Sequence, residues 1–529
     1  MSAEIQPWGD QLAVETIGGV PYRMYAQRPR QVAELLGLAL RWGGRAHLIQ
    51  GERVVGFDGL SRGVAAKSRE LATLGVGRGD RVLIMGWNSP DWVMNFWSCI
   101  HRGAIPVLAN AWWGEAELDY ALELIQPTLV LADSRTEGKI LAQWRRGPWA
   151  ADENSAETLV VPSSGDVTPD RENETAVIVF TSGTSGRAKA VKLPHRALLS
   201  GLQMMLHITK QVPLQFDASR SEIALHTGPL FHVGGPQVML RSIAVGNTLV
   251  FLAGRFDPAD VLALIERHKI NRWTAVPTMI SRALDHPDVN TRDLRSLAAI
   301  GMGGAPVHPD LLERLRTGLP GVDLRVAIGY GLTENTGPAT AASGADTAKY
   351  PGTSGRPLPC VEIRIDPKPD LPDGEILIRS PTLMTGYYGI DETPIDAEGW
   401  LHTGDLGRVD QTGRLWITGR SKELIIRGGE NIAPAAVEKA LNSLPEVSES
   451  AVIGVPHPDL GEEVMAFVVL KTPATAEKLQ TDLKSSLASF SIPSRWHLQT
   501  EPLPTNQTGK VDKRALAAEA LGTEVEQPT

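Results

Sequence analysis

Helical and extended patterns alternate along the first third of the chain, and this alternation limits the folds that it can adopt. Helical patterns cover 60–74, 90–102 and 115–124. Each is followed by a short apolar strand, at 81–86, 104–109 and 128–133 respectively. Strand–helix–strand units of this kind are typical of a parallel sheet covered by helices. The alternation resumes between residues 222 and 328. We therefore expect an α/β fold.

The length and a later change of pattern predict the domain organisation. A chain of 529 residues is too long for a single core, so we expect several folding units. Short strands and turns replace the alternation from 352 to 420, and a mixed segment with one clear helix, 434–444, follows. These changes predict a large N-terminal domain of stacked α/β sheets with a small β-rich subdomain, residues 1–420. A small α+β C-terminal domain, residues 421–529, completes the chain.

Charge and cysteine content exclude several classes of protein. The net charge of −9 leaves no excess of basic residues for a nucleic-acid partner. The two cysteines, Cys99 and Cys360, are far apart and suggest neither a disulfide framework nor a metal site, which favours a reducing compartment. The N-terminus has no signal-peptide pattern, and the longest apolar helical patch, 32–40, is too short to span a bilayer. We expect a cytoplasmic protein without a transmembrane segment.

Four segments rich in glycine or polar residues follow directly on predicted strands. They are GPLFHVGG (228–235), VPTM (276–279), GMGGAP (301–306) and GYGLTENTG (329–337). The carboxyl ends of parallel strands meet at one edge of a sheet, where open α/β sheets bind ligands. We therefore expect all four segments to face one cleft.

The segment FTSGTSGRAKAV, residues 180–191, predicts an anion-binding loop. It does not have the spacing of a Walker loop, and the alternating AVKLP after the lysine predicts a second strand where a Walker loop would open a helix. Hydroxyls and backbone amides would then hold a mobile phosphate group. An ordinary glycine–serine turn is the alternative. The phosphate-binding candidates are Thr181, Ser182, Gly183, Thr184, Ser185, Gly186 and Lys189.

This loop resembles the phosphate-binding signature of the adenylate-forming superfamily, which includes acyl-CoA synthetases, aryl-CoA ligases, luciferases and the adenylation domains of peptide synthetases. The chain departs from that signature at Ala188 and Ala190, where the family usually has proline and glycine. Further segments resemble the family's other motifs in the same order: GYGLTENTG, HTGDLG (402–407), GRSKELIIRGGENI (419–432) and LPTNQTGKVDKRAL (503–516). The resemblance covers nearly the whole chain.

The resemblance implies an acyl- or aryl-CoA synthetase that uses ATP, Mg²⁺ and coenzyme A. A carboxylate would attack the α-phosphorus of ATP to give acyl-AMP and pyrophosphate, and a thiol would then release AMP. By resemblance, Thr333 contacts the α-phosphate, Glu334 holds Mg²⁺ and Lys510 reaches the carboxylate and the α-phosphate. Lys189 and His232 complete the expected catalytic set. Lys422 would be the pivot of a mobile C-terminal domain.

Nucleotide and coenzyme A contacts are expected at the remaining motifs. Tyr330 offers a flat face for adenine, and Asp405 would accept hydrogen bonds from the ribose hydroxyls, with Arg420 as a further donor. Gly428 and Gly429 resemble the motif that leaves room for the pantetheine arm in CoA ligases. Backbone contacts to the base are expected from Gly303, Gly304, Ala305 and Gly331. GMGGAP does not indicate a dinucleotide fold, because no acidic residue ends the next strand, 324–328.

The acid pocket is expected to be apolar. Phe231 and His232 stand where amino-acid activators of the superfamily place an aspartate, so the predicted substrate is a fatty or aromatic monocarboxylic acid. The predicted pocket residues are His232, Val233, Gly234, Gly235, Val276, Met302, Gly329, Thr336 and Gly337. Two alternatives stay open, a ligase that loads an acyl-carrier protein and a catalytically idle adenylate-binding protein. A homodimer is a further partner to consider.

Overall fold

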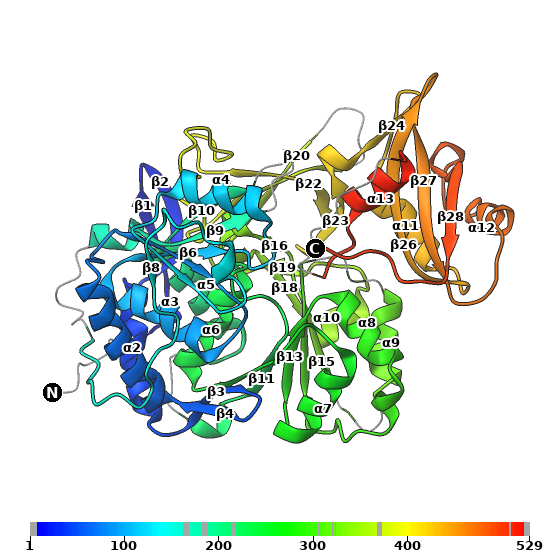
Figure 1. The fold of residues 1–529 in the computed structure, drawn as a ribbon. Helices are drawn as coiled ribbons and strands as arrows, with labels where there is room; N and C mark the ends of the chain where they lie inside the picture. Colours follow the sequence, from blue (N-terminus) through cyan, green and yellow to red (C-terminus); the bar gives the residue numbers. More distant parts are fainter. Residues whose placement is uncertain are drawn as a thin grey trace.

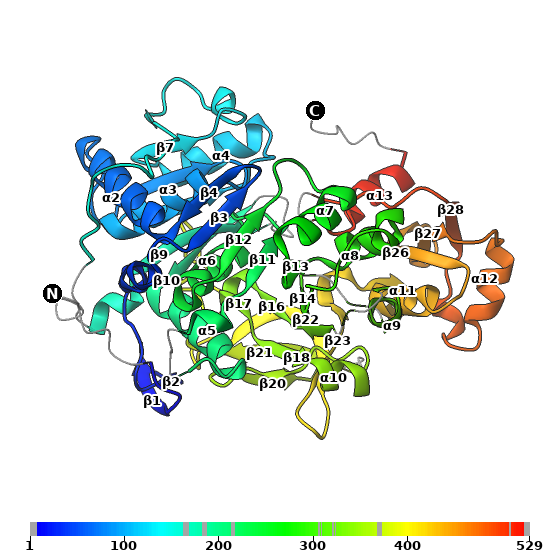
Figure 2. The same cartoon turned by 90° about the horizontal axis from the view of Figure 1, so that it is seen from below.

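The protein is described by a computed structural model, which places residues 8–161, 169–181, 188–212, 217–304, 307, 309–319, 322, 324–367, 373–506 and 509–522. Figure 1 shows a large N-terminal part and a smaller C-terminal part, coloured orange to red, that lies against one side of it. The same division is visible from below in Figure 2.

A six-stranded sheet carries most of the first third of the chain. Its strands, in spatial order, are β10 (Lys189–Pro194), β9 (Thr175–Thr181), β6 (Ile105–Ala109), β5 (Arg81–Met85), β7 (Leu129–Ala132) and β8 (Arg146–Gly147). All neighbours in it are parallel except β10 and β9. The helices between its strands are α2 (Phe57–Thr73), α3 (Pro90–Arg102) and α4 (Glu115–Ile125). The predicted alternation is therefore confirmed.

The bounds of α3 show how local chemistry sets these elements. The Ser89 hydroxyl oxygen accepts a hydrogen bond from the Trp92 amide at 3.1 Å, and Pro90 occupies the first helical turn. Gly103 ends the helix in the left-handed region, at φ +70°. Every residue from Pro90 to Ile100 except Asp91 is buried, so the helix lies inside the domain.

A nine-stranded sheet forms the second layer. Its strands, in spatial order, are β19 (Arg356–Pro357), β18 (Thr340–Ser343), β15 (Arg325–Ile328), β14 (Ala299–Met302), β13 (Arg272–Ala275), β11 (Ile223–His226), β12 (Thr248–Phe251), β3 (Ala46–Gln50) and β4 (Arg53–Gly56). The six strands from β15 to β3 are parallel. One apolar cluster joins this sheet to the first, and α5 (His195–Ile208) and α6 (Gly234–Val245) contribute side chains to it.

The other face of the nine-stranded sheet is covered by α7 (Pro258–His268), α8 (Pro277–Asp285) and α9 (Pro309–Thr317). Side chains of alternate residues in β13, β14 and β15 pack beneath these helices in a separate apolar cluster, which includes Trp273, Ile300 and Val326. The intervening residues of the same strands point to the opposite face. This division of faces positions the candidate site.

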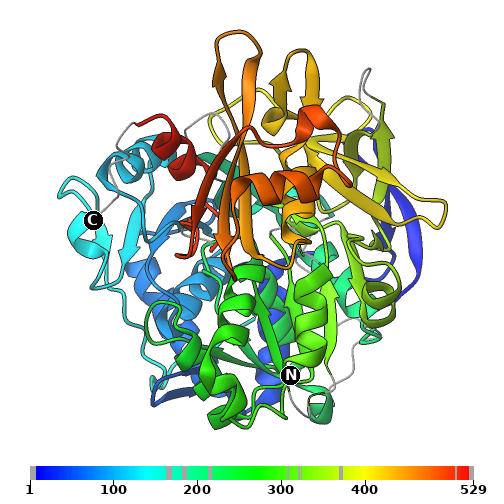
Figure 3. The same cartoon turned by 90° about the vertical axis from the view of Figure 1, so that its right-hand side faces the viewer.

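Two smaller sheets follow. An antiparallel sheet contains β20 (Glu362–Asp366), β21 (Gly374–Arg379), β22 (Leu401–Val409) and β23 (Leu415–Arg420). The C-terminal sheet contains β24 (Ile425–Arg427), β25 (Glu430–Ile432), β26 (Val447–His457), β27 (Gly461–Leu470) and β28 (Arg495–Gln499), with α11 (Pro434–Asn442), α12 (Ala476–Leu483) and α13 (Lys513–Ala520) around it. Figure 3 looks onto this C-terminal part.

The remaining elements are short. They are the hairpin β1 (Leu12–Ile17) and β2 (Val20–Tyr25), the pair β16 (Gly331–Leu332) and β17 (Gly337–Pro338), and helices α1 (Leu36–Ala39) and α10 (Gly344–Lys349). Among the helices that the structure describes, none combines the length and apolar character needed to cross a bilayer.

Candidate active site

Loops that follow four neighbouring strands meet at one edge of the nine-stranded sheet. β11, β13, β14 and β15 are adjacent and parallel, so their carboxyl ends point the same way. The segments 228–235, 276–279, 303–304 and 329–337 follow these strands directly. The prediction that they share one edge is confirmed, and this is the edge at which open α/β sheets bind ligands.

The predicted anion loop lies between two antiparallel strands. Lys189, the first residue of β10, pairs with Thr181, the last residue of β9. Strand β10 follows the loop, and helix α5 begins only at His195, after Pro194. The strand–loop–strand arrangement is thus confirmed. Ser182, Gly183, Thr184, Ser185 and Gly186 lie outside the described residues.

Tyr387 connects two of the predicted catalytic residues. The Lys189 ammonium lies over the Tyr387 ring, 4.6 Å from its centroid, and the Tyr387 hydroxyl donates to Glu334 Oε1 at 3.0 Å. Burial and the Glu334 carboxylate raise the pKa of Tyr387, so its hydroxyl keeps its proton. The sequence analysis missed Tyr387, because its contacts depend on an isolated antiparallel bridge to Val191 in β10.

The segment after β15 is held by buried hydrogen bonds. Thr333, Glu334 and Asn335 form a short 3-10 helix, and Thr333 is buried. Thr336 has φ +53°, and its hydroxyl donates to the Thr382 carbonyl at 2.7 Å. The Thr336 hydroxyl is thus used to anchor the turn, and the predicted place of Thr336 in the acid pocket stays a prediction.

Asp405 is at the centre of a cluster of polar side chains that bond to its carboxylate. It lies directly opposite Arg420 in the β22–β23 pair, and Arg420 Nε is 2.8 Å from Asp405 Oδ1. The Tyr330 hydroxyl donates to Asp405 Oδ2 at 2.6 Å, and Asp405 is 3% exposed. A carboxylate has about four acceptor positions, so two remain for a ligand. The adenine-stacking role of Tyr330 stays a prediction.

Lys510 reaches this edge from the C-terminal part. Its turn is closed by a bridge between Thr505 and Val511. The Thr278 hydroxyl at the start of α8 donates to the Gly509 carbonyl, which joins the two parts of the chain. Lys510 Cε is 3.3 Å from the position that a Cβ would take on Gly304. The predicted lysine therefore lies against Gly304, one of the predicted nucleotide-binding glycines.

Burial and neighbouring charge alter the titration of the groups around Lys510. Burial and the Arg420 guanidinium lower the pKa of the Lys510 ammonium. Burial and the Lys510 charge lower the pKa of His232 to about 4, so this imidazole is neutral near pH 7. The edge thus brings Asp405, Arg420, Lys510 and a neutral His232 into one electrostatic environment.

Family models match most of the chain. The AMP-binding enzyme model matches residues 38–388, and the model of the AMP-binding enzyme C-terminal domain matches residues 436–510. The chain belongs to the AMP-binding enzyme family. The resemblance noted from the motifs is therefore confirmed.

Curated relatives and solved structures agree with this assignment. Feruloyl-CoA synthase of Amycolatopsis is 32% identical over 519 residues, which cover 94% of this chain and 97% of the relative. Long-chain-fatty-acid–CoA ligase of Bacillus subtilis is 30% identical over 500 residues, covering 84% and 86%. The structure of o-succinylbenzoate coenzyme A synthetase of Bacillus subtilis with ATP and magnesium has a TM-score of 0.74 at 29% identity, covering 90% and 98%. The predicted α/β fold with large and small domains is confirmed.

The two glycines predicted to face coenzyme A form a tight turn in this AMP-binding enzyme. Gly428 and Gly429 join β24 to β25, and their φ angles are +59° and +88°. Two positive φ values are typical of a type I′ hairpin turn, which glycine favours. Both glycines are exposed, and so is Lys422, the predicted pivot. The turn alone explains both glycines, so their role in thiol access stays a prediction.

The predicted pocket residues divide between two faces of the sheet. Val276, Gly303 and Gly329 lie on the face away from α7–α9, whereas Met302 belongs to the apolar cluster beneath those helices. Strand alternation turns the Met302 side chain away from Val276, and the predicted place of Met302 in the pocket stays a prediction. A Cβ on Gly235 would lie 2.0 Å from the Leu230 carbonyl oxygen, so close packing explains that glycine.

The other predicted pocket glycines differ in their surroundings. A Cβ on Gly329 would lie 2.5 Å from the Thr340 carbonyl oxygen, and one on Gly337 would lie 2.9 Å from Gln237 Nε2. Gly234 is exposed and has open space around it, while Val233 is buried. A Cβ on Gly331 would lie 2.1 Å from the Gly337 carbonyl oxygen, across the β16–β17 pair. Ala305 lies outside the described residues.

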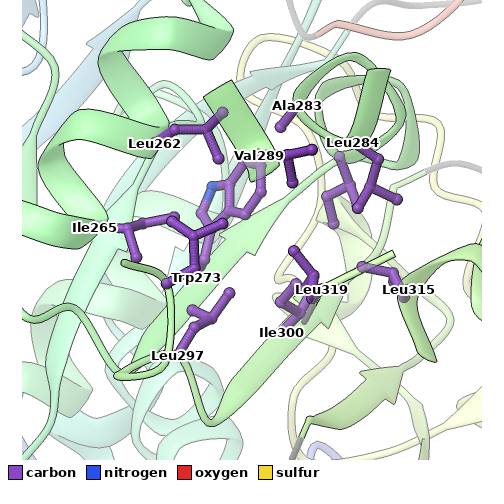
Figure 4. Close-up of a pocket in the computed structure, with 12 residues that line it drawn as sticks. Leu262, Ile265, Trp273, Ala283, Leu284, Val289, Leu297, Ile300, Leu315 and Leu319 are labelled. Carbon is purple, nitrogen blue, oxygen red and sulfur yellow. The ribbon is translucent and has the colours of Figure 1, made fainter. Parts of the chain in front are cut away.

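A cavity elsewhere in this domain does not serve as the acid pocket. It lies between the nine-stranded sheet and helices α7–α9, and Figure 4 shows apolar side chains such as Trp273, Leu297 and Ile300 pointing into it. Its volume of about 10 Å³ leaves room for at most one water molecule. It is a packing defect of the core on the face opposite Val276.

We expect Asp405→Ala to weaken ATP and AMP binding at least tenfold. The ribose hydroxyls would lose a charged acceptor, and each such hydrogen bond contributes about 1.5–3 kcal/mol. Isothermal titration calorimetry measures the effect. Tyr330→Phe is the matched control, because it removes one anchor of Asp405 but keeps the carboxylate. An unchanged nucleotide affinity in Asp405→Ala would show that Asp405 only supports the hairpin.

Proposed function

We propose that this AMP-binding enzyme is an AMP-forming acid–thiol ligase that converts a hydrophobic carboxylic acid into its CoA thioester. The observation that carries the proposal is the docking of Lys510 against Gly304 beside the buried Asp405. In the first step, the acid attacks the α-phosphorus of ATP and pyrophosphate leaves. In the second, the CoA thiol attacks the acyl carbon of acyl-AMP and AMP leaves.

The first step needs alignment and charge neutralisation rather than a general base. A carboxylic acid with a pKa of about 4 is already ionised at neutral pH. Lys189, over the Tyr387 ring, and Lys510, beside Gly304, would supply positive charge, and Thr333 would supply a hydroxyl for the α-phosphate. Charges fixed in advance at the reacting phosphate stabilise the transition state without reorganisation.

The surroundings of Glu334 fit a magnesium ion shared with phosphate oxygens. Mg²⁺ usually takes one or two carboxylates together with substrate phosphates and water. Among the described residues no cluster of three acidic, histidine or cysteine side chains occurs, so Glu334 would act alone. Its Oε1 accepts from Tyr387, which fixes the carboxylate. When bound, the ion supplies further positive charge to the triphosphate.

Asp405, Arg420 and Tyr330 would hold the nucleoside. The two free acceptor positions of Asp405 suit the two ribose hydroxyls, and the open backbone at Gly303 suits a flat base.

We place the domain boundary after Arg420, where β23 ends, with Lys422 in the 3-10 helix Ser421–Glu423 as the pivot.

The residues at this edge also suggest which carboxylic acid and which thiol are the substrates. Phe231 and His232 carry no negative charge to pair with an ammonium group, since His232 is neutral. A fatty or aromatic acid therefore fits better than an amino acid. We favour free CoA over an acyl-carrier protein as the thiol, although both present a pantetheine arm. Two buried thiols, Cys99 and Cys360, suit a cytoplasmic enzyme, and a homodimer remains a proposal.

A substrate panel tests the proposed function. We expect AMP release that depends on CoA with fatty or aromatic acids and no turnover with free α-amino acids, because Phe231 and His232 offer no acidic partner for an ammonium group. Parallel assays with CoA and with a phosphopantetheinylated carrier protein identify the thiol. Efficient ATP–pyrophosphate exchange with an amino acid would contradict the assigned acid class. Absence of exchange with every acid would instead support an idle adenylate-binding protein.

A further inference from the structure

A row of residues in register crosses the sheet face beside the active edge. Phe251, His226, Thr274, Gly301 and Ala327 pair in that order across β12, β11, β13, β14 and β15. Residues paired in neighbouring parallel strands project from the same face. This face is the one that carries Val276, Gly303 and Gly329, away from the cluster beneath α7–α9.

Space remains above this row. Phe251 is fully buried under the core that joins the two large sheets. Thr274, by contrast, is exposed although it lies in a central strand of nine. Gly301 has no side chain, and Ala327 is small and half-buried. The sheet face formed by Thr274, Gly301 and Ala327, which would be the floor of the acid pocket, is therefore open to a ligand.

The open floor is continuous with the active edge. Residues two positions apart on a strand are about 6.6 Å apart. One such step from Thr274 and Gly301 leads to Val276 and Gly303. Val276 Cγ1 lies within 3.9 Å of the position of a Cβ on Gly304, beside Lys510. A substrate whose carboxylate meets Lys510 can thus extend its tail across Thr274.

His226 borders this floor with unused hydrogen-bonding groups. It is 6% exposed, and neither ring nitrogen has a partner among the described residues. Burial and the neighbouring His232 lower the pKa of His226 to about 4, so the neutral ring has one donor and one acceptor. Buried polar atoms of this kind nearly always have partners.

Two other histidines of this protein each have one ring nitrogen bonded to the backbone. His47 Nδ1 is 3.0 Å from the Asn247 carbonyl oxygen, and His195 Nδ1 accepts from the Val32 amide at 3.1 Å. These rings have a backbone partner that explains their position. His226 has none in the part of the chain that the structure describes, so a partner from outside the protein is the simplest account.

We propose that His226 forms a polar subsite for an oxygen-bearing substituent on the tail of the acid, so that the substrate is a hydroxy- or oxo-substituted carboxylic acid. This inference rests on the proposed function and narrows its substrate class. A hydroxyl complements the neutral ring at either nitrogen, and a keto oxygen accepts from its N–H. A second carboxylate would lack a cation here, because the imidazole is uncharged.

Matched acids test the subsite. Benzoate, phenylacetate and phenylpropanoate are each compared with their para-hydroxy derivatives, and cyclohexylpropanoate with its para-oxo analogue. This series moves the oxygen away from the carboxylate by one and then two methylene groups, which covers part of the step of about 6.6 Å between successive rows. We expect the wild type to prefer the oxygenated member of at least one pair by about 10–100-fold in kcat/KM. His226→Leu should abolish or invert that preference, and His226→Gln should restore part of it.

Thr274→Val is the control on the same floor, because it removes a hydroxyl without changing shape. The preference should survive in Thr274→Val and disappear only in His226→Leu. Equal preference in the wild type and in His226→Leu, or no preference in any pair, would overturn the proposal and leave a buried water as the partner of His226.

Calorimetric titration of the same acid pairs into the enzyme with a non-hydrolysable ATP analogue separates the two levels of inference. A binding preference that depends on His226 without any AMP release would contradict the proposed function but support the subsite. Turnover of the unsubstituted acids without any preference for the oxygenated ones would support the proposed function and contradict the subsite. Melting temperatures of all variants check that they are folded.

Discussion

Lys510→Ala will reduce acyl-adenylate formation at least 100-fold and leave thioester formation from supplied acyl-AMP nearly intact. Lys510 lies against Gly304, and its pKa is lowered mainly by burial, so its charge is held in a site with little solvent. Loss of one such preorganised electrostatic group typically costs a factor of about 100–1,000 in rate. The second half-reaction has no developing charge on the triphosphate for Lys510 to neutralise.

Rapid-quench measurement of acyl-AMP and acyl-CoA resolves the two steps. Lys513→Ala is the matched control, because Lys513 is three residues away but pairs with Glu438 at 2.7 Å within the C-terminal part. It should change neither step by more than about twofold, because its half-buried ion pair lies within the C-terminal part. An equal loss of both half-reactions in Lys510→Ala, with the fold intact, would mean that the lysine supports a single fixed arrangement.

The sequence predicted the fold well because its signals are local. The pattern of 90–102, with Ser89 before it and Gly103 after it, predicts the bounds of α3 from capping chemistry alone. Parallel strands with glycine-rich loops likewise predict a common edge. What local pattern does not determine is the face to which a given side chain turns. Met302 and Gly303 are adjacent and point to opposite faces, but only the packing of α7–α9 shows that Met302 is the one in the core.

The missed residues depend on contacts between distant segments. Tyr387 joins Lys189 to Glu334 through a bridge between residues almost two hundred positions apart, and its own neighbourhood is a loop-like stretch. His226 gains its significance from register with Thr274 and Gly301, which no periodicity in a single strand reveals. Conversely, Gly428 and Gly429 matched a motif, yet their backbone conformation supplies a purely local reason for glycine.

Substitutions at two glycines of the C-terminal part should affect the two half-reactions differently. Gly509 and Gly429 have φ angles of +79° and +88°, so alanine costs about 1 kcal/mol of backbone strain at either position. Their surroundings differ. A Cβ on Gly509 would lie 2.9 Å from Val276 Cγ2, whereas one on Gly429 has nothing within 4 Å. Gly509→Ala should therefore push the Lys510 turn off α8 and slow adenylation more than tenfold, while Gly429→Ala should leave adenylation unchanged.

Gly429→Leu should produce the opposite phenotype. Figure 1 shows β24 at the far end of the C-terminal part from α8, the helix that the turn before Lys510 contacts. If the domain rotates about Lys422 after adenylation, this hairpin turn approaches the site, and a leucine would obstruct a passage sized for backbone. Acyl transfer from supplied acyl-AMP should then fall at least tenfold in Gly429→Leu but little in Gly429→Ala. Alanine and leucine carry the same backbone strain, so equal losses would assign the effect to a distorted turn. A selective loss with leucine requires that the C-terminal domain present Lys510 and Gly429 to the site in succession.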